Sequence, residues 1–142
     1  MADDVLLNKA AIIERCVCRA REEYAKDPLA FPEDFTRQDA AILNIQRACQ
    51  AAMDMGHHLI RRERLGLPQG GRDLFVLLAR AGWISAPLAN DMQGMVGFRN
   101  IAVHDYQTLL LPILIRILTE RLDDLTRFAH TILSHDQAPS PS

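Results

Sequence analysis

The sequence predicts an all-α fold, a bundle of four long helices and one short helix. Apolar residues recur three or four positions apart through most of the 142 residues, which is the spacing of one helix face. No stretch shows the sustained alternation of apolar and polar residues that a half-buried strand has. Residues that start or stop helices separate the periodic segments, and the length suits one domain with its own core.

The first two predicted helices are long, and a proline-containing turn separates them. The apolar face of the first helix consists of Leu6, Ala10, Ile13, Val17, Ala20 and Tyr24. Pro28 and Pro32 cannot continue that helix, and Thr36 is the expected N-cap of the second. The apolar face of the second helix consists of Ile42, Ile45, Cys49, Ala52, Gly56 and Leu59. Gly66 and Pro68 then end it.

Three further helices are predicted, one short and two long. The short helix covers residues 72–82 and is closed by a glycine. Ser85 is the expected N-cap of the fourth helix, whose stripe consists of Leu88, Met92, Met95, Arg99, Ala102 and Tyr106. Thr108 is the expected N-cap of the fifth, whose face consists of Leu111, Ile115, Leu118, Leu122, Leu125, Ala129 and Ile132. We expect one domain over residues 1–134 and a disordered tail over 135–142.

Composition excludes several classes of protein. A formal net charge of −2 gives no overall basic field, so a nucleic-acid site would have to be a local basic patch. Cys16, Cys18 and Cys49 fit no zinc-ligand spacing, and we expect small buried thiols in a reducing compartment. The start of the sequence does not read as a secretion leader. The most apolar run, residues 109–118, is too short for a membrane span and contains Arg116, so a cytoplasmic protein is expected.

The stretch FRNIAVHDY, residues 98–106, concentrates the residues that could perform chemistry. Arg99 falls on the apolar stripe of the fourth helix, where a cation is unfavourable unless it is paired or faces a polar cavity. Asn100 and His104 are four apart and share another edge of that helix. Arg99 and His104 lie about 140° apart on an ideal helix. They can meet if the arginine reaches around, or if the helix loosens near its end.

Two interpretations of this pair remain open. An imidazole moves protons near neutral pH and a guanidinium stabilises charge on phosphoryl oxygens, so a convergent pair could cleave RNA without a metal. Alternatively, His104 is a buried histidine and Arg99 forms a salt bridge with a neighbouring helix, for which Asp39 is one candidate partner. Spacing alone favours the second interpretation.

The sequence around Arg99 and His104 resembles that of a known family. RNIAVHDY matches the R-x4-H-x-Y form of the motif of the HEPN superfamily, as found in HepT toxins. Residues 39–60 and 75–106 are also similar to HepT sequences, and the resemblance covers about three-quarters of the chain. It implies a HEPN-like helical fold that dimerises through the motif helix. It further implies a metal-independent endoribonuclease that needs no cofactor and is the toxin of a type VII-like toxin–antitoxin system.

The resemblance also assigns roles to four residues. Arg99 and His104 match the catalytic pair, and Asn100 matches a supporting polar neighbour. Tyr106 matches the tyrosine to which the nucleotidyltransferase antitoxin, MntA, adds AMP. The implied partners are therefore RNA, that antitoxin and a second copy of the chain, with no DNA and no membrane. Two alternatives are a non-catalytic scaffold for a nucleotidyltransferase and a helical bundle that binds a nucleotide.

Other candidate sites have weaker support. His57 and His58 with Asp54 supply only two ligands on one helix face, so no metal is expected there. The one tight basic cluster consists of Arg61, Arg62 and Arg64. It could guide RNA or an antitoxin, or simply complement the end of a helix. Gly94 and Gly97 permit close helix approach, either in a dimer or within the bundle.

Overall fold

The fold is all-helical, as predicted. A computed structural model describes residues 3–104 and 111–137, with the backbone alone at 103 and 104. Within these ranges the elements are α1 (Asp4–Ala25), η1 (Phe31–Glu33), α2 (Phe35–Glu63), α3 (Gly71–Arg80), α4 (Ala86–His104), α5 (Leu111–Arg116), η3 (Ile117–Arg121) and α6 (Leu122–Gln137). The last three follow without a break, with η3 as one π-helical turn, and form the fifth predicted helix. Four long helices and one short helix are thus confirmed.

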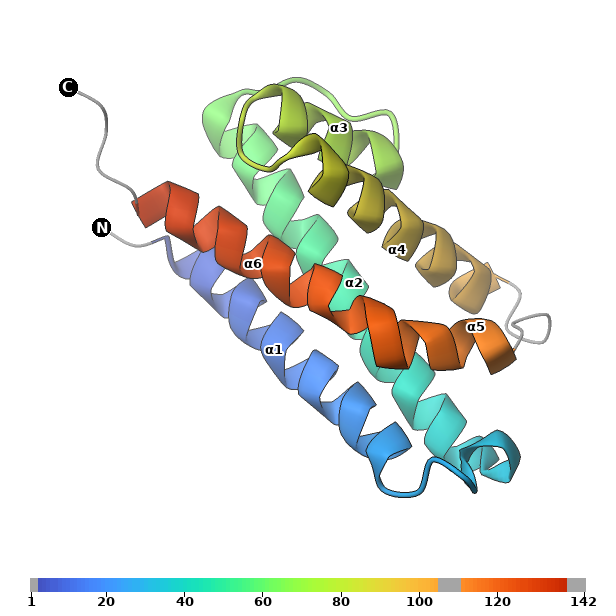
Figure 1. Cartoon of the computed structure of the whole chain (residues 1–142). Coiled ribbons are helices and arrows are strands. Elements are labelled where there is room, and N and C mark those ends of the chain that lie inside the picture. The colour runs from blue at the N-terminus through green and yellow to red at the C-terminus, as the bar shows by residue number, and fades with distance from the viewer. Residues whose placement is uncertain (1–2, 105–110, 138–142) are drawn as a thin grey trace.

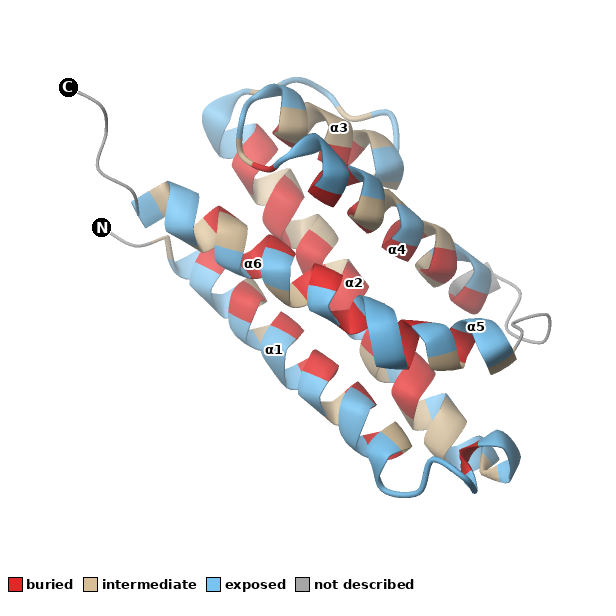
Figure 2. Ribbon diagram, in the orientation of Figure 1, coloured by how far each residue is buried: buried red, intermediate tan, exposed pale blue. Residues whose placement is uncertain are grey.

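The helices form a bundle around one core. α1 and α2 form the most extensive pair, and α6 packs along α1 and also contacts α2 and α4 (Figure 1). α4 lies beside α2, and the short α3 packs on both. Buried residues face inward from all the long helices, while the outer faces are exposed (Figure 2). α4 therefore contacts three other helices, which matters because it carries the R-x4-H segment.

The starts of the helices show one correct and one wrong prediction. Ser85 caps α4 as expected, since its hydroxyl accepts a hydrogen bond from the Leu88 N–H at 3.2 Å. Thr36, however, is not the N-cap of α2. Asp34 has that role, because the preceding 3-10 turn ends beside it and its carboxylate accepts from the Arg37 N–H at 3.1 Å.

The predicted apolar faces are the core. Nearly all their members are buried, including Leu6, Ala10, Ile13, Val17, Ala20, Ile42, Ile45, Cys49, Ala52, Leu59, Leu118, Leu122, Leu125, Ala129 and Ile132. A Cβ at Gly56 would lie 3.0 Å from the Leu74 side chain, so this glycine allows α3 to approach α2 closely. Within residues 3–104 and 111–137, no helix combines the length and apolar character needed to cross a membrane.

The end of the chain departs from the prediction. A tail was expected over 135–142, but α6 continues through Gln137. Asp136 accepts a hydrogen bond from Arg62 at 2.7 Å, and this contact with α2 keeps the last turn helical. The remainder of the expected tail lies outside the described residues, as does Thr108, the expected N-cap of the fifth helix.

Arg62 joins three segments at this end of the bundle. Besides Asp136, it donates to Asp3 at 2.9 Å and to Glu63 at 2.8 Å, and it lies 5.7 Å from the centre of the Trp83 ring. The middle arginine of the basic cluster is thus engaged within the chain and is unavailable for guiding RNA. The other two members are exposed: Arg61 and Arg64.

Asp3 is the acidic centre of this contact network. Its carboxylate also caps α1 and lies 2.6 Å from the His58 ring nitrogen. Burial raises the pKa of Asp3, but hydrogen bonds from His58, the Leu6 N–H and Arg62 outweigh it and bring the pKa down from 3.8 to about 2. The folded chain therefore keeps this carboxylate ionised at a pH where the unfolded chain has taken up the proton.

Asp3→Asn should retain the cap on α1 and lose the charge. At pH 7 we expect it to be about 1–2 kcal/mol less stable than the wild type in urea unfolding followed by circular dichroism. Because the pKa of Asp3 falls from 3.8 to about 2 on folding, this difference should be complete above pH 3.8 and should shrink as the pH falls toward 2. Asp4→Asn, at the exposed neighbouring position, is the control. A stability difference independent of pH would contradict the assignment.

Candidate functional site

Arg99, Asn100 and His104 lie on the last described turns of α4. This helix runs without interruption from Ala86 to His104, so it does not loosen between 99 and 104, which was one of the two ways in which Arg99 and His104 could meet. On a regular helix those two positions are about 140° apart. For His104 only the backbone is described, and Tyr106 lies outside the described residues. One copy of α4 therefore presents its arginine and histidine positions on different faces.

Arg99 is positioned by α2. Its stripe is buried as predicted, with Leu88, Met92, Met95 and Ala102 in the core, while Arg99 itself is half-buried. One guanidinium nitrogen donates to Gln50 Oε1 at 2.7 Å, and another lies 3.4 Å from Asn100 Oδ1. The unfavourable cation on an apolar stripe is thus stabilised by a neutral amide of the neighbouring helix.

The Gln50 amide is itself oriented by a charged pair. Its Nε2 donates to Asp54 Oδ1 at 2.9 Å, and Asp54 Oδ2 accepts from Lys9 Nζ at 3.3 Å. Since Asp54 can only accept, the amide nitrogen must face it, which leaves Oε1 directed at Arg99. The result is a relay of side chains from α1 through α2 to α4, with Arg99 at its end.

This arrangement corrects one expectation and adds residues that the sequence did not identify. Asp39, the candidate partner of Arg99, is exposed and forms no ion pair within the described part of the chain. Gln50 takes that place, because it lies three turns further along α2, next to the motif end of α4. The available signal was Gln50 and Asp54, four apart and beside the apolar face of a predicted helix.

Cys49 lies beneath this site and is chemically inert. Its thiol is buried and lies 3.8 Å from the Met95 carbonyl oxygen. Burial raises its pKa to about 12, although the positive charge of Arg99 acts in the other direction. Cys16 is buried too, whereas Cys18 is exposed beside Glu22, so the prediction of three buried thiols is wrong for Cys18. Among the described residues, no three His, Cys, Asp or Glu side chains cluster as metal ligands.

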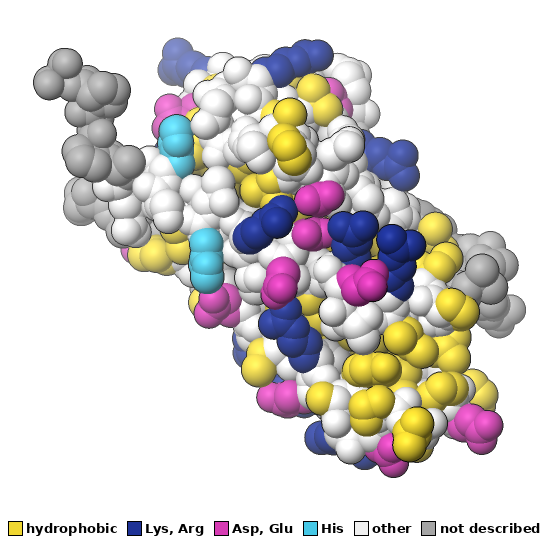
Figure 3. All heavy atoms as spheres, in the orientation of Figure 1, with side chains coloured by type: hydrophobic (Ala, Val, Ile, Leu, Met, Phe, Trp, Pro, Cys, Tyr) yellow, Lys and Arg dark blue, Asp and Glu magenta, His cyan; other side chains and the backbone are white. Residues whose placement is uncertain are grey.

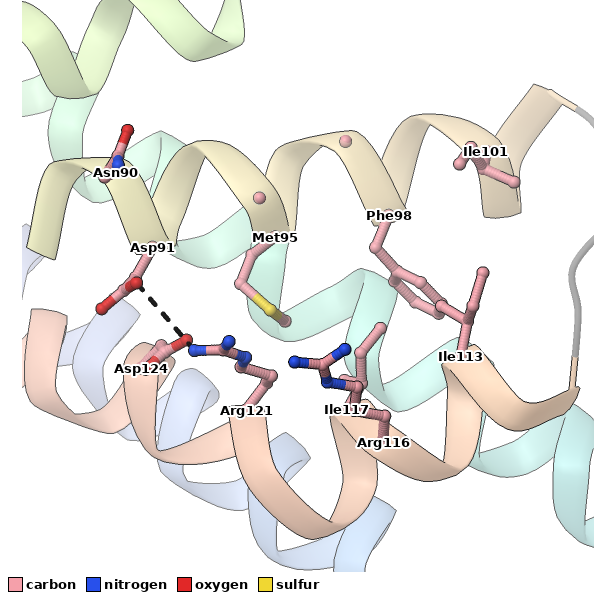
Figure 4. A pocket seen from close by; sticks show the side chains of 12 residues that line it. Asn90, Asp91, Met95, Phe98, Ile101, Ile113, Arg116, Ile117, Arg121 and Asp124 are labelled. Carbon is pink, nitrogen blue, oxygen red and sulfur yellow. Dashed lines mark ion pairs between the residues drawn. The ribbon is translucent and has the colours of Figure 1, made fainter.

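A hollow lies on another face of α4. It has a volume of about 480 Å³ and separates α4 from the segment α5–η3–α6 (Figure 4). Phe98, Ile101 and Ile113 form an apolar end, while Arg121 lies 4.0 Å from Asp91 at the other. Ile101 and Ile113 are 45% and 43% exposed. Arg99 does not line this hollow, because it faces α2.

Charged and hydrophobic side chains occupy different parts of the surface around the hollow. Figure 3 shows acidic and basic side chains mixed across α6, and hydrophobic side chains gathered over α5 and the start of α2. At the end of the hollow with Asp91 and Arg121, burial raises the pKa of Asp124, and the nearby Asp91 carboxylate adds to that effect. Gly94 borders the hollow, and no atom lies within 4 Å of the position that a Cβ would take there. This edge of α4 is therefore open.

Comparison with known proteins agrees with the geometry. Residues 8–132 match the family model described as ribonuclease HepT-like. A relative from Shewanella oneidensis named mRNA nuclease HepT is 45% identical over 130 residues, which span 92% of this chain and 97% of the relative.

Solved structures give the same result. One is a tri-AMPylated Shewanella oneidensis HEPN toxin in complex with MNT antitoxin, with a TM-score of 0.87, 45% identity and coverage of 92% of this chain and 97% of that chain. Another is a toxin–antitoxin with AMP-PNP, with a TM-score of 0.87, 44% identity and coverage of 92% and 98%. The uninterrupted motif helix, the buried stripe that ends at Arg99 and these matches lead to one conclusion: this chain belongs to the HepT-like ribonuclease family.

Proposed function

We propose that this chain is a cytoplasmic, metal-independent endoribonuclease, the toxin of a type VII-like toxin–antitoxin system. The observation that carries the proposal is the placement of Arg99 in a HepT-like fold. Its guanidinium is fixed by the neutral Gln50 amide, so its positive charge remains available for a phosphate. The relatives' names, an mRNA nuclease and an AMPylated HEPN toxin bound to its antitoxin, support the same function.

The proposed chemistry needs only side chains and the substrate. The ribose 2′-oxygen attacks the adjacent phosphorus and the bond to the 5′-oxygen breaks, which leaves a 2′,3′-cyclic phosphate and a 5′-hydroxyl. His104 accepts the 2′-hydroxyl proton and returns a proton to the leaving oxygen. Arg99 stabilises the charge that develops on the phosphoryl oxygens, and Asn100, next to Arg99, supports it.

A homodimer through α4 would complete the site. Because positions 99 and 104 lie on different faces of one helix, a cleft between two copies of α4 can receive the arginine of one copy and the histidine of the other. The open edge at Gly94 and the half-exposed Ile101 favour close contact between two such helices.

The proposed control is AMPylation of Tyr106 by an MntA-type nucleotidyltransferase. In the sequence, Tyr106 comes two positions after His104, the last described residue of α4. An AMP group there would add negative charge where an RNA phosphate must bind, and it would compete for Arg99. The tri-AMPylated relative bound to its antitoxin supports this partner.

The first experiment tests cleavage. Purified wild-type chain should cut single-stranded RNA in the presence of EDTA and should leave 2′,3′-cyclic ends. It should not cut a substrate in which the scissile 2′-hydroxyl is replaced by hydrogen. His104→Ala and Arg99→Ala should each lower kcat/KM by about two orders of magnitude or more, with unchanged circular dichroism. A requirement for magnesium, or equal cutting of DNA, would sink the proposed mechanism, whereas a chain that cuts no RNA would leave the scaffold alternative.

A second experiment tests the role of Gln50. Gln50→Met has a similar length but no oxygen to accept from Arg99, so we expect kcat to fall about tenfold while the melting temperature changes little. Gln50→Glu retains an acceptor oxygen, but its charge would neutralise Arg99 and repel Asp54, so kcat should stay low. Asn44→Met is the matched control, because Asn44 also lies on α2 but bonds only to a backbone carbonyl of its own helix. Unchanged kcat in Gln50→Met would contradict the positioning role.

A third experiment tests the control by AMP. Intact mass spectrometry of the chain, incubated with its nucleotidyltransferase and ATP, should show additions of whole AMP units that map to Tyr106. Tyr106→Phe should acquire none and should remain toxic when both proteins are expressed together. Additions at another residue, or a modified chain that still cuts RNA at the wild-type rate, would contradict this role for Tyr106.

A further inference from the structure

Arg72 lies against the bare backbone of the motif helix. It is the second residue of α3, and its carbonyl oxygen accepts from Gln93 Nε2 of α4 at 3.2 Å. A Cβ built on Gly97 would lie only 2.8 Å from Arg72 Nη2 and 3.8 Å from Cζ. The guanidinium therefore occupies the space that a side chain at position 97 would fill.

Apart from the contact with Arg72, a glycine at position 97 only destabilises the helix. A glycine inside a helix is about 1 kcal/mol less favourable than alanine, and α4 continues regularly on both sides of it. The other glycine of the pair, Gly94, has no neighbour within 4 Å, so only Gly97 serves a contact inside the chain. The contact that it serves is with a cation.

The charge of Arg72 is not neutralised within the described part of the chain. Some other arginines contact carboxylates, as Arg62 does with Asp3 and Asp136 and Arg127 does with Asp91. Arg72 is exposed and no carboxylate of residues 3–104 or 111–137 lies within 4 Å of it. An exposed guanidinium without a carboxylate beside it is suited to binding an anion.

The position of this cation relates it to the proposed catalytic residues. Positions 97 and 104 are seven apart, so on a helix they lie within about 20° of each other and about 10 Å apart along the axis. Arg72 is thus on the face of α4 that carries position 104, two turns before it. Arg99 belongs to a different face, so the two arginines are not redundant.

We propose that Arg72 binds a phosphate of the RNA strand next to the scissile one, and that Gly97 makes room for its guanidinium. This inference rests on the proposed ribonuclease function. Arg72 is a substrate-binding residue here and takes no part in the proton transfers. It sets the direction in which a strand crosses α4, because a second fixed phosphate contact orients the chain of nucleotides.

The test measures binding without cleavage. In a His104→Ala background, fluorescence anisotropy would give the Kd of a labelled single-stranded RNA oligonucleotide between about 50 and about 200 mM salt. Adding Arg72→Ala should raise Kd roughly tenfold and lower the slope of log Kd against log salt by about 0.7, the value for one phosphate contact. Adding Gly97→Ala instead should also raise Kd, because the new Cβ displaces the guanidinium with no change of charge.

The control separates a site from a general charge effect. Arg80→Ala removes the same charge from an exposed position of α3, and its Kd and salt slope should stay close to those of the parent. Equal effects of Arg72→Ala and Arg80→Ala, or an unchanged slope in Arg72→Ala, would overturn the inference alone. A parent protein that binds no RNA would overturn it together with the proposed function.

Discussion

The position of a guanidinium on the apolar stripe of α4 is the constraint on which the site depends. Arg99 continues a row of buried methionines and leucine, where an isolated charge would be strongly unfavourable. The Gln50 amide oxygen of α2 accepts a hydrogen bond from Arg99. The Gln50 amide is oriented by Asp54, which in turn accepts from Lys9. The three long helices α1, α2 and α4 are therefore linked by one polar path at the edge of the core. A shift of any of them would move the guanidinium.

α4 combines three different surfaces, and this explains its composition. One face is buried against α2, a second is bare at Gly97, where Arg72 of α3 covers it and the hollow begins, and a third continues along the hollow to Ile101, beside Ile113. An ordinary amphipathic helix would place polar residues on the two outer faces. Here those faces carry glycines and a half-exposed isoleucine. Such a helix is suited to contacts with a second chain and with a substrate, in addition to its own bundle.

Local patterns predicted most of the fold, and long-range contacts account for the errors. The apolar faces and the Ser85 cap follow from spacing alone and are confirmed. The helical end of α6 could not be predicted in that way, because it depends on Asp136 meeting Arg62 of α2. The cap at Asp34 was missed because a 3-10 turn moved the start of α2. In the site, the apolar stripe of the fourth predicted helix indicated that Arg99 faces the bundle. No pattern within α4 could identify Gln50 as its partner.

The identity of that partner has a chemical consequence. Had Asp39 paired with Arg99, a carboxylate would have neutralised the cation, and a phosphate would have had to displace it. Separating one member of a buried ion pair is unfavourable by about 3–5 kcal/mol, whereas a neutral hydrogen bond contributes only about 1 kcal/mol net. The Gln50 oxygen fixes the guanidinium at 2.7 Å and leaves its charge in place. Other donors of the planar guanidinium stay available, so Arg99 can bind a phosphate without losing the contact that positions it.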